Sequence, residues 1–163
     1  QVEHYYYYLE FFNKFDMWGE VFPGTKINKT FTMSSNFTLV ISLLFKGSDV
    51  TKERLVQSYK IPDSPESGHL ASKIIFLNEL LKLTPDNVTD LYKKKVQCGI
   101  DDMTILEWYY INVYKENKDV LIKFLEYRPS VSSQELMDKG FKGKPLGDEI
   151  KRLEIEKFKN LLK

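Results

Sequence analysis

The sequence predicts an all-α protein, a multi-helix bundle of at least seven helices that ends in a small glycine-hinged helical tail. Apolar residues recur at three- and four-residue spacings along most of the chain, which is the periodicity of a helix with one buried face. Glycines, prolines and capping residues interrupt that pattern at intervals typical of short helices. No stretch sustains the two-residue alternation that marks a half-buried strand. Apolar residues make up 42% of the 163 positions, which is enough to bury a core.

The first helix is expected over residues 2–18. Leu9, Phe12 and Phe15 follow one another at helical spacing and therefore form one apolar face. Gly19 is placed to end this helix, and the Phe-Pro-Gly sequence that follows predicts a turn. The many aromatic residues could stack on nucleobases, but their helical spacing favours packing in the core.

Further helices are expected through the middle of the chain. Ser34 or Ser35 can cap the helix after residue 36, Asp86 or Asn87 can cap the helix after residue 87, and Pro65 can occupy a first helical position. The helix after residue 36 is so strongly apolar that it should lie inside the bundle. The expected segments are 36–46, 52–59, 65–83, 88–98, 103–114 and 119–127.

No catalytic arrangement is recognisable in this chain. Nucleotidyl transfer needs carboxylates that converge on two metal ions, whereas Asp101 and Asp102 open a helix, point in different directions and are predicted to be caps. Cys98 has no recognisable catalytic partner, and His4 and His69 do not provide the ligand spacing of a zinc site. We therefore expect that the chain alone does not catalyse and binds no cofactor.

Charge and cysteine content constrain the setting of the protein. The 24 basic and 23 acidic residues nearly cancel, so any nucleic-acid surface would have to be local. The longest apolar run, 39–45, is far shorter than the roughly 20 residues that span a bilayer. A single cysteine excludes an intramolecular disulfide and fits a reducing compartment. A soluble, cytoplasmic protein without membrane contact is expected.

Residues 131–163 are predicted to form a helical hairpin. Ser132 or Ser133 can cap a short helix that Gly140 ends. Gly143 allows a close approach to a neighbour, and Pro145 can preset the first turn of a longer helix.

The start of that longer helix has the chemistry of a phosphate site. Unpaired backbone N–H groups around 144–147 should point outward, and Lys142 and Lys144 flank them. Gly147 would let a sugar-phosphate backbone come close, or equally let two helices pack tightly. Asp148 and Glu149 complement the same helix dipole and could weaken phosphate binding.

The stretch 131–153 resembles the tail of class II CCA-adding enzymes, which are tRNA nucleotidyltransferases. In that family an acidic-Leu-Met sequence, a glycine-bounded turn and a Leu-Gly pair lead into the last amphipathic helix. Ser133 departs from the family's usual glycine, and Phe141 replaces a smaller aliphatic residue. The matching residues are Glu135, Leu136, Met137, Gly140, Phe141, Gly143, Leu146, Gly147, Ile150 and Leu153.

The N-terminal end is more weakly similar to the segment that follows the neck of the same family. There a leucine-rich helix ends in a glycine and leads to a Phe-Pro turn. The residues that match are Leu9, Phe12, Phe15, Met17, Trp18, Gly19, Val21, Phe22 and Pro23.

The resemblance implies a helical body over 1–130, continuing from a neck outside this sequence, and a tail over 131–163. In the family, head and neck carry the catalytic carboxylates, bind Mg²⁺ and select CTP and ATP. Body and tail hold the acceptor-TΨC half of tRNA through its phosphates and sugars. The implied partners are therefore tRNA and the head and neck of the same polypeptide, with the chemistry of a transferase located in the missing head.

The resemblance also implies the RNA-contacting residues. A further basic run, 93–95, is either an additional contact or a solvated helix surface. The expected contacts in the tail are Lys139, Lys142, Gly143, Lys144, Gly147, Lys151 and Arg152.

Two other classes of function remain open on the sequence. A helix-hairpin-helix-like DNA-binding module also has two helices around a glycine turn, although its two glycines are two residues apart and Gly140 and Gly143 are three apart. A helical protein-interaction domain without any nucleic-acid role is the second. A related polynucleotide adenylyltransferase is disfavoured, because a long basic extension is expected at its end.

Overall fold

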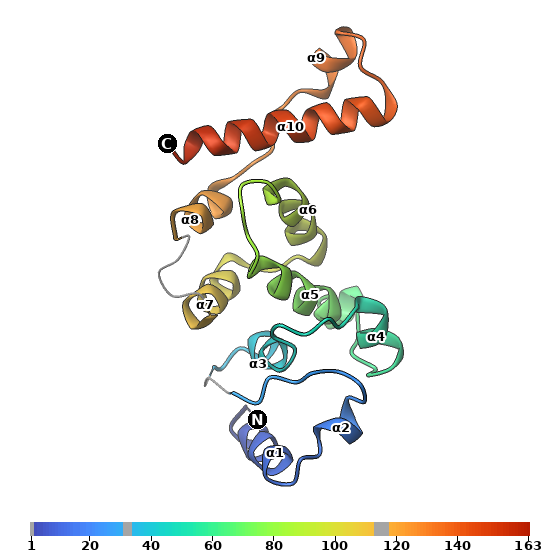
Figure 1. Ribbon diagram of the computed structural model, residues 1–163, viewed down its shortest axis with the longest axis vertical. Coiled ribbons are helices and arrows are strands. Elements are labelled where there is room, and N and C mark those ends of the chain that lie inside the picture. The colour runs from blue at the N-terminus through green and yellow to red at the C-terminus, as the bar shows by residue number, and fades with distance from the viewer. Residues whose placement is uncertain (1, 31–33, 113–117) are drawn as a thin grey trace.

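The computed structural model describes the backbone of residues 2–30, 34–112 and 118–163, with side chains from Tyr7 onward within these ranges. The described part contains ten α-helices, one 3-10 helix and no strand, so the all-α prediction and the expectation of at least seven helices are confirmed. The helices follow one another along an elongated molecule, with α1 near one end and α9 and α10 at the other (Figure 1). None of the described helices combines the length and apolarity that crossing a membrane would require.

The bounds of the helices agree with most of the predicted segments. The predicted helix 103–114 is described only up to Asn112, and its last two positions lie outside the described residues. The helices are α1 Val2–Lys14, α2 Trp18–Val21, α3 Phe37–Leu44, α4 Lys52–Gln57, η1 Pro65–Ser67, α5 Leu70–Leu80, α6 Val88–Cys98, α7 Asp102–Asn112, α8 Lys118–Glu126, α9 Ser133–Asp138 and α10 Gly143–Leu161.

Two clusters of buried side chains hold the helices together, and α3 and α5 belong to both. The first core includes Leu9, Trp18, Ile27, Val40, Leu44, Phe45, Leu55, Ala71 and Ile74. The second core includes Leu39, Leu43, Phe76, Leu77, Leu80, Leu83, Val88, Leu91, Cys98, Ile100, Ile105, Trp108, Leu121, Phe124, Tyr127 and Phe158. Because α3 is strongly apolar, it contributes Leu39 and Leu43 to one core and Val40 and Leu44 to the other, as its composition predicted.

The chain breaks within the predicted helix 2–18, and this prediction was wrong in its extent. Asp16 has a positive φ of 50°, which turns the chain so that Trp18 is buried and donates from Nε1 to Asn13 Oδ1 at 2.7 Å. The Trp18 ring also meets Phe12 edge to face at a centroid distance of 5.2 Å. Gly19 does not end the helix but lies inside α2. Burial of the tryptophan outweighs the continuation of the helix.

The predicted helix 65–83 is likewise divided. Pro65 occupies a first helical position, as predicted, but the helix it opens is the short η1. Gly68 and His69 both adopt left-handed backbone conformations, and α5 begins only after them. Asp63 secures the start of α5, because its two carboxylate oxygens accept from the backbone amide and the hydroxyl of Ser72 at 2.9 and 2.8 Å.

Helix α10 is attached to the body by its C-terminal half. Phe158 is fully buried and belongs to the second core. Lys159 pairs with Asp86 at 2.7 Å across the same boundary. Although the division at residue 130 stays a prediction, the last helix of the tail completes the core of the body.

Candidate nucleic-acid interface

The turn between α9 and α10 is built by specific local hydrogen bonds. Ser132 caps α9 by accepting from the backbone amide of Glu135 at 3.3 Å. At the other end, Gly140 has a φ of +94° and donates to Met137 O at 2.9 Å, while Phe141 donates to Leu136 O at 3.1 Å. These two bonds form a Schellman motif, which requires a left-handed residue where Gly140 stands.

Helix α10 begins at Gly143, two residues before Pro145, which corrects the predicted position of the unpaired amides. Lys142 is the N-cap, with an extended backbone and no side-chain cap hydrogen bond. Gly143 follows with a φ of +58°. The first four N–H positions of a helix lack intrahelical acceptors, but Pro145, the last of the four, has no N–H. The unpaired amides are therefore those of Lys142, Gly143 and Lys144, so Lys144 is the only residue of the predicted range 144–147 whose amide is unpaired.

These amides lie in a basic and accessible environment. Within the described ranges no residue accepts a hydrogen bond from any of them. The side chains of Lys139, Lys142 and Lys144 are exposed, and in the same ranges none of the three has an ion-pair partner. These three lysines together with Gly143 are called the basic turn below. The structure thus brings four of the seven predicted contact residues together at one end of the molecule.

Lys151 and Arg152 are engaged elsewhere. Lys151 pairs with Asp90 of α6 at 2.6 Å. Arg152 pairs with Glu149 at 2.7 Å and with Glu156 at 3.1 Å, both on its own helix. The hydrogen bond and charge of Glu149 raise the pKa of the Arg152 guanidinium above its usual range. A phosphate at either side chain would have to compete with these carboxylates, so the structure separates them from the basic turn.

Gly147 lies on an open face of α10. A Cβ atom added to it would meet nothing within 4 Å. Tight packing of one helix on another, which the sequence offered as one reason for this glycine, is therefore not its role in the described structure. The exposed surface beside Gly147 leaves room for another molecule to approach the helix backbone.

The two acidic residues expected to weaken phosphate binding lie beyond the first turn of α10, which contains no acidic residue. Glu149 is directed to Arg152, whose hydrogen bond holds the pKa of this carboxyl below its usual value. Asp148 is exposed. Because Glu149 is paired, the positive end of the α10 dipole is less opposed than the sequence suggested.

Two of the three lysines in the basic run 93–95 are paired with carboxylates, and only Lys93 and Lys94 are exposed. Lys95 is 9% exposed, pairs with Asp102 at 2.5 Å and places its Nζ 5.9 Å from the centre of the Phe124 ring. Lys94 pairs with Glu79 at 2.5 Å. The neighbouring apolar residue Val96 is 62% exposed, whereas Lys95 occupies a buried position of the helix.

Sequence reasoning missed Glu154, a carboxylate of α10 that is 2% exposed. Its Oε1 accepts from the backbone amides of Ser130 and Val131 at 2.6 and 2.5 Å. Its Oε2 accepts from the Tyr127 hydroxyl at 2.9 Å. Burial and this hydrogen bond raise the pKa of Tyr127 well above its usual range. The available signal was its spacing, since Glu154 lies one turn before Phe158 on the face that packs against the body.

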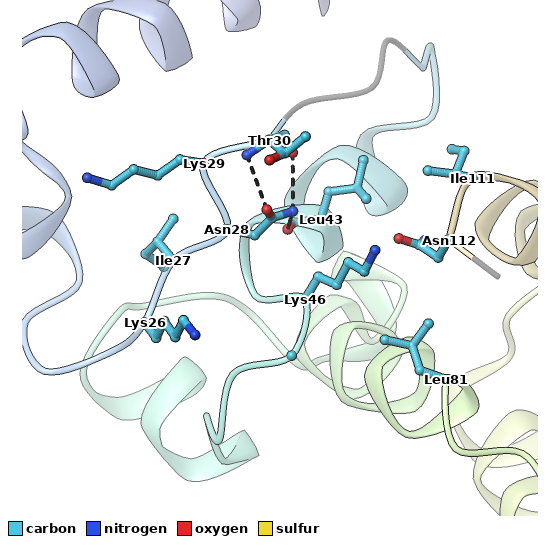
Figure 2. A pocket seen from close by; sticks show the side chains of 11 residues that line it. Lys26, Ile27, Asn28, Lys29, Thr30, Leu43, Lys46, Leu81, Ile111 and Asn112 are labelled. Carbon is cyan, nitrogen blue, oxygen red and sulfur yellow. Dashed lines mark hydrogen bonds between the residues drawn. The ribbon is translucent and has the colours of Figure 1, made fainter.

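A hollow of about 610 Å³ lies between the segment before α3 and the end of α3. Lys26, Lys29 and Lys46 line it (Figure 2). Lys29 points away from the hollow in Figure 2 and pairs with Asp16 at 2.7 Å. Lys46 follows the C-terminal end of α3, where a cation is favoured by the helix dipole. Lys29 and Lys46 therefore have local structural roles.

Asp101 and Cys98, which were considered as catalytic residues in the sequence, have structural environments. Asp101 caps α7 by accepting from the backbone amide and the hydroxyl of Thr104 at 2.8 and 2.7 Å, as predicted. Cys98 is buried, and burial raises the pKa of its thiol. Among the described residues, no group of three or more His, Cys, Asp or Glu could hold a metal ion.

Comparisons with protein-family models, with curated proteins and with solved structures find no match to this chain. The chemistry of the tail therefore rests on its geometry: the lysines around the start of α10 and the first amides of this helix have no partner in the part of the chain that the structure describes. Such a place is chemically suited to an oxyanion, and a phosphate is the oxyanion that it would meet in a nucleic acid.

Proposed function

We propose that this chain is the tRNA-binding body and tail of a CCA-adding tRNA nucleotidyltransferase, and that the basic turn holds the ribose-phosphate backbone of tRNA. The proposal rests on three exposed lysines and three backbone amides that come together at the start of α10 and have no partner among the described residues. Amides, helix dipole and lysine charges all favour an anion at the same place.

The glycines of the turn support a nucleic-acid backbone as the ligand. Gly140 and Gly143 have positive φ values and shape the turn. Gly147 lies one helical turn after Gly143, and open space surrounds the Cβ position of each. A phosphate could therefore reach the backbone of α10 without meeting a side chain. All three glycines fall at positions where the sequence resembles the tail of the family, so each matching position has a physical use.

Duplex RNA is a suitable partner for such a surface. The major groove of an A-form helix is deep and narrow, so proteins bind double-stranded RNA through phosphates, 2′-hydroxyls and shape. A surface made of backbone amides and lysines offers these contacts and reads no base sequence. The chain would anchor the acceptor-TΨC half of tRNA in the cytoplasm, while the head outside this sequence, with Mg²⁺, adds CCA from CTP and ATP.

The proposal is tested by titrating fluorescently labelled tRNA and duplex DNA against the chain at several salt concentrations. We expect tRNA to bind more tightly than duplex DNA. The double variant Lys142→Glu/Lys144→Glu should weaken tRNA binding by about tenfold or more and reduce the slope of log affinity against log salt by about two, one for each lost phosphate contact.

A matched control is the double variant Lys26→Glu/Lys82→Glu, which makes the same change in net charge at two exposed lysines outside the basic turn. It should leave the salt slope nearly unchanged. Equal binding of duplex DNA and tRNA would favour the DNA-binding alternative. Indifference of the wild-type chain to every nucleic acid would contradict the proposal and favour the protein-interaction domain.

A further inference from the structure

We infer that Glu154 is the positioning residue of the basic turn: from α10 it fixes the segment between α8 and α9, and so sets how α9 enters the turn. An effect of Glu154 on RNA binding rests on the proposed function. Its effect on the position of the segment between α8 and α9 is a property of the fold and can be tested without RNA.

The contacts of Glu154 are unusually complete for one side chain. Both carboxylate oxygens are used: one accepts from two consecutive amides, Ser130 at 2.6 Å and Val131 at 2.5 Å, and the other accepts from Tyr127 at 2.9 Å. Within the described ranges, these two amides have no other acceptor. Because the two amides depend on this one acceptor, Glu154 holds the segment 127–131 against α10.

The segment is also connected to the body. The ring of Tyr127 meets Tyr92 of α6 edge to face at 5.1 Å and Phe158 of α10 at 5.7 Å. Lys157 adds a hydrogen bond of 3.1 Å to the Ser130 hydroxyl. Tyr127 therefore holds the end of α8 in the second core, and Glu154 continues this anchoring to the first residues that lead into α9.

The chain runs from the anchored segment through α9 and the basic turn into α10, and Glu154 of α10 contacts the anchored segment again. Ser132, which caps α9, directly follows Val131, and α9 leads through the Schellman motif at Gly140 into α10. Glu154 lies eleven residues after Gly143 on that helix, or about 16 Å along its axis. In Figure 1 the connection from α8 crosses α10 before it reaches α9. The hairpin is thus closed at both ends, by the turn and by Glu154, so loss of the carboxylate would open one end.

A positioning role depends on the reach of the side chain more than on its charge. Glu154→Gln keeps that reach: the amide oxygen can accept from Ser130 and Val131, and the amide nitrogen can donate to the Tyr127 oxygen. Glu154→Asp keeps the charge but withdraws the oxygens by one carbon–carbon bond. A role based only on charge would give the opposite order of effects. Glu53→Gln, at an exposed position of α4, is the control for the loss of one negative charge.

The first measurement is amide hydrogen exchange by NMR on the whole chain. In Glu154→Asp we expect exchange at Ser130 and Val131 to become about tenfold faster or more, because their buried acceptor is displaced. Glu154→Gln should change it only a few-fold, and amides of the first core should stay protected in both. Unchanged exchange at these two positions in Glu154→Asp, or a larger effect of Glu154→Gln, would overturn the inference.

The second measurement is tRNA affinity, combined with Lys142→Glu/Lys144→Glu. Glu154→Asp should weaken binding about fivefold to tenfold, but should add little once the two lysines are replaced, because it acts through them. Independent, multiplicative losses would refute the link to the basic turn. If the wild-type chain binds no tRNA, the proposed function and this link fall together, while hydrogen exchange still decides whether Glu154 fixes the segment.

Discussion

Lys151 of α10 and Asp90 of α6 form an ion pair of 2.6 Å that joins the tail to the body. Their side chains are 44% and 48% exposed, so the pair should contribute at most about 1 kcal/mol to stability. The pair nevertheless engages Lys151, a residue that the family resemblance had led us to expect as an RNA contact.

The first prediction distinguishes this lysine from those of the basic turn. Lys151→Gln should lower tRNA affinity clearly less than Lys144→Gln, because the charge of Lys151 is already offset by Asp90. Both affinities can be measured by fluorescence anisotropy at one low salt concentration. Equal losses would show that Lys151 leaves Asp90 to contact RNA.

The second prediction separates stability from binding at Gly147. Gly147→Ala should raise the free energy of unfolding by about 0.5–1 kcal/mol, because alanine favours a helix interior and its Cβ meets nothing within 4 Å. The same methyl group should weaken tRNA binding if the RNA backbone approaches α10 there. Urea unfolding and tRNA titration of one variant test both. Tighter or unchanged binding would place the RNA elsewhere.

The third prediction concerns the turn itself. Gly140→Ala should destabilise the protein by about 1 kcal/mol, because a φ of +94° strains any residue with a Cβ. Space is not the cause, since nothing lies within 4 Å of the Cβ position. Gly140→Asn should lower the free energy of unfolding by less, because asparagine tolerates left-handed conformations better than alanine does. Thermal unfolding of the two variants gives the comparison, and equal losses would argue against backbone strain.

The fourth prediction concerns acid stability. Burial pushes the pKa of Asp101 upward, but the hydrogen bonds from the Thr104 hydroxyl and amide together hold it below its ordinary value. A carboxyl with a lowered pKa in the folded state stabilises fully above its unfolded value of 3.8, and this contribution disappears as the pH falls through the lower folded value.

Urea unfolding at a series of pH values from about 6 down to 2 should therefore show a loss of stability in the acid range. In Asp101→Asn that loss should be smaller, because one titrating carboxyl has been removed. Asp63, whose pKa is lowered by Ser72 and Lys52 against the effect of burial, should contribute in the same direction. An unchanged acid dependence in Asp101→Asn would exclude this role for the cap.

The sequence predicted those features of the structure that depend on interactions between residues a few positions apart. The left-handed Gly140, the Ser132 cap and the Asp101 cap follow from residue types that favour these conformations and bonds. The start of α10 was misplaced by two residues, because proline is tolerated anywhere in a first helical turn and does not by itself mark the first position.

The features that the sequence did not predict depend on packing between residues from different segments. The break before Trp18 arises because burial of its ring requires the chain to turn, and the burial of Lys95 requires Asp102 and Phe124 from other segments. The division of the tail cations into free and paired sets depends on Asp90, which lies 61 residues before Lys151.

The sequence by itself determined the all-helical class, most of the helices and the glycine turn with its lysines, because periodicity, capping and backbone freedom are properties of neighbouring residues. Only the tertiary structure decided which lysines keep their charge available and that Glu154 fixes the entry to α9. Ion pairs and buried hydrogen bonds depend on which distant groups the folded chain brings within about 3 Å, and no local pattern contains that information.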